Sequence, residues 1–451
     1  MADTTGDDLV DAALDQLARR DQQQADAARA AFASLTWGAG PDAVTLYGLC
    51  EWVWYRLPDK WSCDLAEHMQ LAEALGALFE LLEMPRYARV CRSETTADVL
   101  AAWDRGRKDG LKAMAAARAA SGVDPPDVPG LIWGEVMGKE ETAALFATAT
   151  RLEMTMAAGE FTPGNRGWRQ AAQQAAAAYL MMPRSDLDGE SWLQRIHAER
   201  LQDWTRSHGS PRGRLAAVFA GQLAEPVPAP RQAPQLLAPV SWLLRKAVGE
   251  GGIPLTHSHT LARAVVGEGC QRFGWLTATG RPRSESDIVE AWTLRTMARE
   301  LGAVRRQGRR LLATSAGKKL ATASAPALWS AVTPTLLPAS RAEAAAGEIA
   351  LMLLLAGRNT DHASLTAAVA DAMAAEGWHS PDTGQPIDAE AAGWLLGELY
   401  RRLNLLGLVE RRRSLTTTRL TAPGRAAAHA ALRAHALRPR TASSADSHGG
   451  P

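Results

Sequence analysis

The chain has 451 residues and a mass of 48.3 kDa, with 46% hydrophobic and 22% charged residues, which excludes a fibrous or largely disordered protein and leaves room for about three domains. The formal net charge is +1, yet residues 1–222 carry −8 and residues 223–451 carry +9, so the two parts are expected to face different partners. The longest unbroken apolar runs, Ala175–Met182 and Ile349–Ala356, are far shorter than the roughly 18 residues of a membrane-spanning helix, so we expect no membrane partner.

The first residues contain Asp3, Asp7 and Asp8 where a secretory or transit signal would carry Lys or Arg, which predicts a cytoplasmic protein. The four cysteines include no CxxC pair, so the sequence indicates neither a disulfide framework nor a zinc knuckle. We expect these cysteines to be reduced and mostly buried thiols.

Residues 9–222 are predicted to form a helical N-terminal domain, because segments rich in Ala, Leu, Glu and Arg alternate with Gly and Pro breakers and strand signals are scarce. Within this domain, Trp52, Trp54, Tyr55 and Trp61 could form a stacking platform for a ligand or a helix-packing core, and such clusters are more often core. The acidic charge of the domain suits it to bind a protein partner, or to shield the basic half of the chain.

Four prolines between residues 226 and 234 predict a linker over residues 223–239, because proline is excluded from helix interiors and favours an extended connector. At the other end of the chain, residues 438–451 are predicted to form a disordered tail, since Thr441–Pro451 has no large apolar residue. Between these two segments we expect folded structure that differs from the helical N-terminal domain.

Residues 240–335 and 341–437 are predicted to form two copies of one module, because two segments about 105 residues apart follow the same pattern. In each copy an amphipathic helix ends at a glycine, Gly302 or Gly407, that can take the left-handed conformation which stops a helix. A valine, a basic hairpin and a further helix then follow in both copies. A helix followed by a two-stranded wing and a second helix is typical of the end of a winged helix-turn-helix.

The hairpins are predicted over Val304–Thr314, with its turn at Gln307 and Gly308, and over Val409–Thr421, where the loop is two residues longer. Three helices precede each wing, which agrees with a winged-helix module. The first three are predicted over 240–248 and 260–273 and after a capping box at Ser284, and the second three over 343–355, 364–376 and 388–406.

Two short motifs resemble a known family. Gly407-Leu-Val-Glu-Arg-Arg412 and Leu420-Thr-Ala-Pro-Gly424 resemble the pattern of MarR-type proteins, in which a Gly-Leu-Val turn leaves the recognition helix and an LTxxG step leaves the wing. Leu301-Gly-Ala-Val304 and Ala313-Thr-Ser-Ala-Gly317 are a weaker copy, with Ala where Leu is usual. The resemblance covers residues 240–440 and implies a helix that reads DNA and a wing that touches its backbone. The whole chain also resembles a group of uncharacterised actinobacterial proteins, which implies no activity.

Arginine is concentrated in both predicted wings. Residues 295–319 carry a local net charge of +7 and residues 401–440 one of +9. Duplex DNA carries one negative charge per about 1.7 Å of axis, and basic residues that displace its counterions supply much of the affinity. Arg295 and Arg299 lie four residues apart on one helical face, which suits a major groove. The predicted nucleic-acid-binding residues are Arg295, Arg299, Arg305, Arg306, Arg309, Arg310, Arg401, Arg402, Arg411, Arg412, Arg413 and Arg419.

The sequence contains no catalytic signature. It lacks a GxxxxGK[ST] phosphate loop, and no nucleophile, base and orienting group can be assembled from spacing. His257 and His259 could hold a metal, but two histidines in a loop more often face solvent, and His68 and Asp361-His362 are isolated. We therefore predict no enzyme, no catalytic residue, no metal and no cofactor.

Together these features predict a mainly α protein with a helical N-terminal domain and two winged-helix modules that have short β-hairpin wings. The predicted function is non-catalytic binding of DNA through both wings, in transcription regulation or another regulatory or accessory role. The rival prediction is a protein-interaction scaffold whose winged helices pack on a partner or on the N-terminal domain. Exposed wing arginines would favour nucleic acid, whereas wing arginines paired with Asp and Glu would favour the scaffold.

Overall fold

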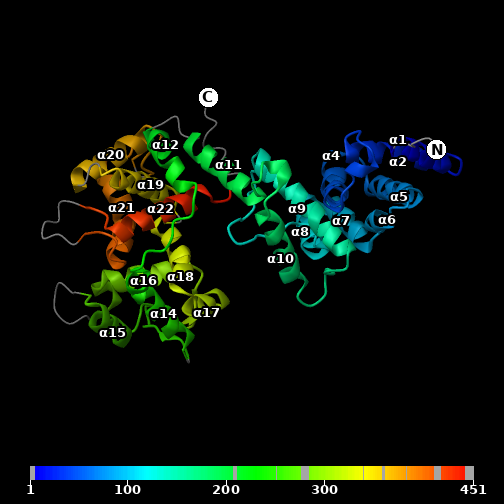
Figure 1. The fold of residues 1–451 in the computed structure, drawn as a ribbon. Helices are drawn as coiled ribbons and strands as arrows, with labels where there is room; N and C mark the ends of the chain where they lie inside the picture. Colours follow the sequence, from blue (N-terminus) through cyan, green and yellow to red (C-terminus); the bar gives the residue numbers. More distant parts are fainter. Residues whose placement is uncertain are drawn as a thin grey trace. The chain divides into compact units, whose positions relative to one another are not determined.

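The computed structural model describes residues 6–206, 211–249, 251–275, 284–338, 340–357, 361–381, 383–410 and 418–441. These residues are mainly helical and include one small three-stranded antiparallel sheet (Figure 1). The chain divides into two compact units, with residues 1–196 and 439–442 in unit 1 and residues 197–438 and 443–451 in unit 2.

Unit 1 is built from helices, and side-chain caps fix the first turns of several of them. The Asp21 carboxylate accepts the Gln24 N–H at the start of α2, and Asp64 and Glu67 form a reciprocal capping box at α5. The elements are α1 (Gly6–Ala18), α2 (Gln22–Thr36), η1 (Pro41–Ala43), α3 (Leu46–Glu51), η2 (Trp52–Arg56), α4 (Leu57–Lys60), α5 (Leu65–Leu81), α6 (Pro85–Cys91), α7 (Glu94–Arg105), α8 (Arg107–Ser121), α9 (Lys139–Ala157), α10 (Trp168–Met181), η3 (Ser185–Leu187) and the start of α11 (Trp192–Arg206).

The tryptophan cluster belongs to the core of unit 1. Trp52 and Trp54 lie in the π-helical turn η2 and are buried. Trp52 Nε1 donates to Ser34 Oγ at 3.0 Å, and Trp54 Nε1 donates to Thr96 Oγ1 at 2.9 Å. Because both rings are buried with satisfied N–H groups, the prediction of a packing core is confirmed for these two residues.

Unit 2 contains the helices predicted before both wings. The capping box at Ser284 opens the short 3-10 turn η4, and the α-helix that follows begins at Val289. The elements are α12 (Pro211–Leu223), α13 (Ala233–Leu236), α14 (Ala238–Val248), β1 (Ile253–Pro254), α15 (Arg263–Phe273), η4 (Glu285–Asp287), α16 (Val289–Glu300), β2 (Val304–Gln307), β3 (Arg310–Ala313), α17 (Ser315–Ala321), α18 (Ala325–Val332), η5 (Thr333–Leu336), α19 (Arg341–Leu355), α20 (His362–Ala374), α21 (Ala389–Leu405) and α22 (Ala422–Ala436).

The two units divide at a different place from the predicted linker. The division falls after Ile196, within α11, whereas the linker was expected at 223–239. Phe219 and Leu223 are buried in the core of unit 2, so α12 joins that unit. Residues 226–230 lie in no helix or strand, and they connect two parts of the same unit.

The first residues of the predicted tail are held in the fold. The Arg440 carbonyl accepts the N–H groups of Glu135 at 2.8 Å and of Val136 at 3.2 Å, so this residue is held within unit 1. Residues 442–451 lie outside the described part of the chain.

The residues of both predicted modules share one hydrophobic core. Figure 1 shows α14 to α18 as one group of helices and α19 to α22 as an adjoining group. Buried side chains from Val240 to Ala436 belong to a single cluster that runs through both groups. The two copies therefore pack as one body.

The helix stops predicted from glycine are confirmed. Gly302 has φ +60° and Gly407 has φ +62°, the left-handed conformation that glycine adopts without a Cβ penalty. Beyond Gly302, Thr314 N donates to Ala303 O at 3.0 Å, and a Cβ on Gly317 would lie 1.9 Å from that carbonyl oxygen. The second copy repeats this arrangement with Thr421, Leu408 and Gly424, again with 1.9 Å between the added Cβ and the carbonyl oxygen.

Replacing Gly317 by Ala is expected to lower the free energy of unfolding by about 1–3 kcal/mol, because the methyl group would be forced into the Ala303 carbonyl. Gly267→Ala is the matched control, since a Cβ on this helical glycine of α15 meets open space and Ala favours the helix. Urea denaturation followed by circular dichroism measures both. Equal denaturation midpoints for the two variants would show that the close approach does not constrain the fold.

Candidate nucleic-acid interface

The first predicted wing is present as a tight β-hairpin. β2 and β3 pair antiparallel with Gln307 opposite Arg310, so the turn consists of Gly308 and Arg309 and lies one residue later than predicted. Gly308 has φ +56°, at the first loop position where type II′ turns place glycine. β3 pairs on its other side with β1, which gives the order β1-β3-β2 and leaves β2 at the edge.

The hairpin is anchored by its apolar side chains and displays its basic ones. Val304 and Leu311 are buried in the core of unit 2. Arg305, Arg306 and Arg309 are exposed, and none of them pairs with an acidic side chain in the part of the chain that the structure describes. The exposed guanidinium groups of the hairpin are therefore accessible to solvent.

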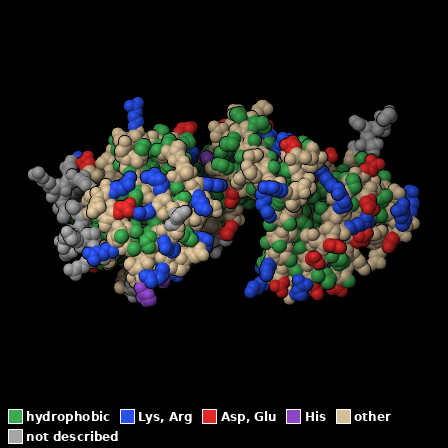
Figure 2. Space-filling model, turned by 90° about the horizontal axis from the view of Figure 1, so that it is seen from below, with side chains coloured by type: hydrophobic (Ala, Val, Ile, Leu, Met, Phe, Trp, Pro, Cys, Tyr) green, Lys and Arg blue, Asp and Glu red, His purple; other side chains and the backbone are tan. Residues whose placement is uncertain are grey.

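Further basic residues are exposed on the neighbouring elements. Arg310 is exposed, and its Nη1 donates to the Gly251 carbonyl at 3.0 Å. Arg299 near the end of α16 and Lys318 and Lys319 on α17 are also exposed. Seen from the side of α14 and α15, unit 2 shows many Lys and Arg side chains with few carboxylates between them (Figure 2).

Arg295, predicted to face a groove, is engaged inside the module. Its Nε lies 2.6 Å from Oε1 of Glu285, whose carboxylate is buried, and the other Glu285 oxygen accepts the Leu261 N–H at 2.7 Å. The pair joins α16 to η4 and to the chain segment before α15. Of the two arginines expected on this face, Arg299 is the exposed one.

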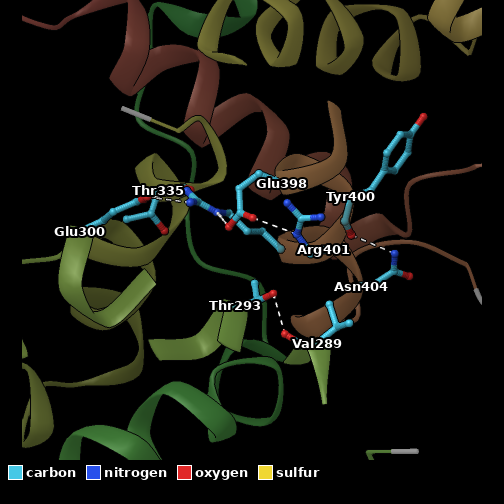
Figure 3. A network of polar contacts seen from close by, with 9 residues as sticks. Val289, Thr293, Glu300, Thr335, Glu398, Tyr400, Arg401 and Asn404 are labelled. Atoms are coloured by element: carbon cyan, nitrogen blue, oxygen red, sulfur yellow. Dashed lines mark hydrogen bonds and ion pairs between the residues drawn. The ribbon is translucent and has the colours of Figure 1, made fainter. Parts of the chain in front are cut away.

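Arg402 is buried, although it was predicted to bind nucleic acid. Its side chain is 1% exposed, and its Nη atoms make two parallel bonds of 2.7 Å to Glu300. Its Nε donates to Glu398 at 2.8 Å, and its Nη1 donates to the Thr335 carbonyl. Figure 3 shows Glu300, Thr335 and Glu398 around this network. Arg402 thus fastens α21 of the second copy to α16 and η5 of the first.

Arg401 also lies at this junction. Its Nε donates to Glu398 at 2.9 Å (Figure 3). Its guanidinium carbon lies 5.2 Å from the centre of the Trp292 ring. The helices that precede the two wings, α16 and α21, therefore contact each other through paired charges and a cation–π contact. Sequence spacing could not show these contacts, because the partner residues lie about 100 positions away.

The structure describes only the two ends of the second predicted hairpin. Val409 pairs with Leu420 in an antiparallel bridge, and the Glu410 N–H donates to the Arg419 carbonyl at 2.9 Å. Arg419 is exposed. The predicted contact residues Arg411, Arg412 and Arg413 lie outside the described residues.

Two exposed tryptophans were not among the predicted site residues. Trp394 on α21 is 78% exposed and Trp292 on α16 is 39% exposed. Trp394 lies about 160° around the helix from the buried Leu396, at 100° per residue, so the helical pattern could have indicated its exposure. Tryptophan is enriched at the energetic centres of protein interfaces.

A buried ionic network connects α11, α12, α19 and α22 in unit 2. Glu348 on α19 is fully buried, and its carboxylate accepts from Arg212 at 2.8 Å and from Trp204, with His435 at 3.2 Å. Burial alone would raise the pKa of Glu348, but His435, Arg212 and the Trp204 N–H favour the carboxylate and hold that pKa below its ordinary range. Arg212 also bonds to Glu376 at 2.9 Å.

The histidines considered as metal ligands are dispersed. His257 and His259 are exposed in the loop after β1, and His68 Nε2 lies 3.3 Å from the Trp61 carbonyl. Asp361 caps α20 by accepting the Ser364 N–H. Within the described ranges, no group of three His, Cys, Asp or Glu side chains could hold a metal ion, and no helix is long and apolar enough to cross a membrane.

Comparison with known proteins gives one partial match. Residues 232–327, which contain β1 to β3 and the helices around them, match the family model described as the Y4jL N-terminal domain. Neither the search among curated proteins nor the search among solved structures finds a match. The matched segment overlaps the first predicted module and includes the exposed hairpin.

Proposed function

We propose that this protein is a non-catalytic DNA-binding protein with a regulatory or accessory role, and that unit 2 contains two fused winged-helix modules. The order of elements supports this proposal. In the first copy, α14, β1, α15 and α16 precede the β2–β3 hairpin, and β1 pairs with the returning strand. In the second copy, α19, α20 and α21 precede the bridge at Val409 and Leu420.

The exposed hairpin carries the proposal. Arg305 and Arg306 on β2 and Arg309 in the two-residue turn are all exposed, and a guanidinium forms bidentate bonds with phosphate. Arg295 and Arg402, in contrast, each pair with a buried carboxylate, that of Glu285 or of Glu398. We therefore propose that the wing contacts the phosphate backbone and that binding depends little on base sequence.

A protein-interaction scaffold is the second candidate function. Trp394 at 78% exposed, with Trp292 and Arg401 close to the α16–α21 junction, is the observation that favours it. Trp and Arg are the residues that most often dominate binding to a protein partner. The acidic unit 1 is a further candidate for contact with a protein.

Fluorescence polarisation tests the proposed function. Two unrelated DNA duplexes are titrated with the full chain at several salt concentrations between about 50 and 200 mM. The proposal expects similar affinities for the two sequences and a steep linear decrease of log affinity with log salt. Trp394→Ala is expected to leave these curves unchanged. Failure of both duplexes to bind at low salt would reject DNA binding and leave the scaffold.

A further inference from the structure

A cavity in unit 1 has the composition of a small-molecule site. Its volume is about 530 Å³, within the range of roughly 300–1,000 Å³ that is typical of ligand pockets. Residues from α3, η2, α6, α7, α8, α9 and the loop after α9 line it. Apolar walls are supplied by Leu46, Trp54, Met156 and Phe161.

One end of this cavity is positively charged. Arg86 and Arg89, one turn apart on α6, both line it. The Arg86 guanidinium lies 2.6 Å from Glu153 and 2.8 Å from the Tyr87 hydroxyl, and it stacks over the Tyr87 ring at 4.7 Å. Glu153 is 5% exposed, so it neutralises the charge of Arg86 and fixes its position.

The Glu153 carboxylate is itself fully engaged. It accepts the Leu46 N–H at 2.7 Å and the Tyr87 hydroxyl at 2.7 Å in addition to Arg86. Burial, together with the bond to this carboxylate, raises the pKa of Tyr87 to about 12, so the hydroxyl stays protonated as a donor. The polar end of the cavity is therefore ordered before any ligand binds.

Arg89 supplies the uncompensated charge. Its Nε donates only to the Pro85 carbonyl, at 3.4 Å, and no acidic side chain in the described ranges pairs with it. Thr95 and Thr162 add exposed hydroxyl groups to the same lining. A cation beside apolar walls favours a ligand that combines an anionic group with an apolar body. The anionic group can pair with the arginine while the apolar body packs against the apolar walls.

A larger cavity of about 770 Å³, also in unit 1, lacks such a free charge. Its carboxylates are already used: Asp21 caps α2, Glu67 closes the capping box of α5 and Glu73 pairs with Arg92 at 2.8 Å. The smaller cavity is therefore the better candidate for recognition of a charged ligand.

We propose that the cavity between α6 and α9 binds a small organic anion, with the anionic group at Arg89 and Arg86 and the apolar body against Trp54 and Phe161. This site is separate from the proposed DNA contact and does not depend on it. The ligand class is an aryl or alkyl carboxylate or sulfonate.

Ligand-observed NMR titration of the full chain tests the site with phenylbutyrate and naphthalenesulfonate as anions, phenylbutanol as the neutral analogue and phenylbutylamine as the cation. We expect at least one anion to bind saturably and about tenfold more tightly than the alcohol, since a hydrogen bond to a charged group has about this value. Arg89→Gln is expected to remove this preference. Ala157→Phe, at an exposed lining position, is expected to block the cavity and weaken all the probes.

Arg105→Gln is the matched control, because Arg105 is an exposed arginine of unit 1 that also bonds only to a backbone carbonyl in its own helix. It should leave every affinity unchanged. The proposal is overturned if neither anion binds saturably, if the amine binds as tightly as the acid, or if Arg89→Gln retains the preference for the anion.

Discussion

Replacing Arg305, Arg306 and Arg309 together by Gln is expected to weaken binding to duplex DNA on the order of 100-fold near about 0.1 M salt. These three exposed arginines of the hairpin pair with no acidic side chain among the described residues, so their loss is expected to remove phosphate contacts and to leave the buried anchors Val304 and Leu311 in place. Any duplex sequence should be affected alike.

The salt dependence gives the sharper measurement. Each phosphate contact contributes about 0.9 to the slope of log affinity against log salt, so the triple variant should lower this slope by about 2.7. Fluorescence polarisation at several salt concentrations yields the slope directly. Replacement of the same residues by Lys should retain most of it, because the charge remains although the bidentate geometry is lost.

A control with the same change of net charge separates wing contacts from bulk charge. Arg19, Arg20 and Arg105 are exposed arginines of unit 1, and their joint replacement by Gln also removes three positive charges. We expect this control to change the slope little. If the control and the wing variant lose equal affinity, or if the wing variant keeps the parental slope, the hairpin does not contact phosphate.

Glu348→Gln is expected to lower the free energy of unfolding of unit 2 by about 3–5 kcal/mol at neutral pH, because it removes the buried negative charge that pairs with Arg212, whose side chain is 11% exposed. The substitution should also weaken the contacts of this side chain with Trp204 and His435. Glu343→Gln on the same helix is the control, since Glu343 forms no ion pair with a described residue. Chemical denaturation measures both variants.

The pH dependence of this effect has a definite sign. The pKa of Glu348 is depressed in the folded protein, so its contribution is present above the pKa of an unfolded glutamate, about 4.3, and is lost as pH falls toward the folded value. The stability difference between the parent protein and Glu348→Gln should therefore be full at neutral pH and smaller near pH 3. A difference that grows on acidification would contradict the assigned charge state.

Local features of unit 2 were predictable from sequence because they depend on residues close together in the chain. The positive φ of Gly302 and Gly407 and the hairpin around Gly308 follow from conformations that glycine adopts at no steric cost. The exposure of Trp394 could also have been predicted from the sequence, because this residue lies on the face of α21 opposite its buried side chains. Helix positions in both copies were confirmed for the same reason.

The roles of particular arginines were not predictable, because they depend on tertiary partners. Arg295 and Arg402 have the same local character as exposed arginines, and only the fold brings Glu285 and Glu300 beside them. The boundary between the units could not be predicted either. The prolines favour extended backbone locally, but they do not indicate that Phe219 packs in the core of unit 2. Charge counts along the chain therefore overstate the positive surface available to a ligand.

The position of β2 at the edge of its sheet has a further consequence for self-association. One side of this strand presents backbone N–H and C=O groups that a strand from a second molecule could pair with. Arg305 and Arg306 are adjacent in β2 and therefore place positive charges on both faces of this edge strand, and the repulsion between two such strands is expected to oppose fibre-like stacking. The same guanidinium groups that suit a polyanion thus also keep neighbouring copies apart, and a chain that loses them becomes more prone to aggregation.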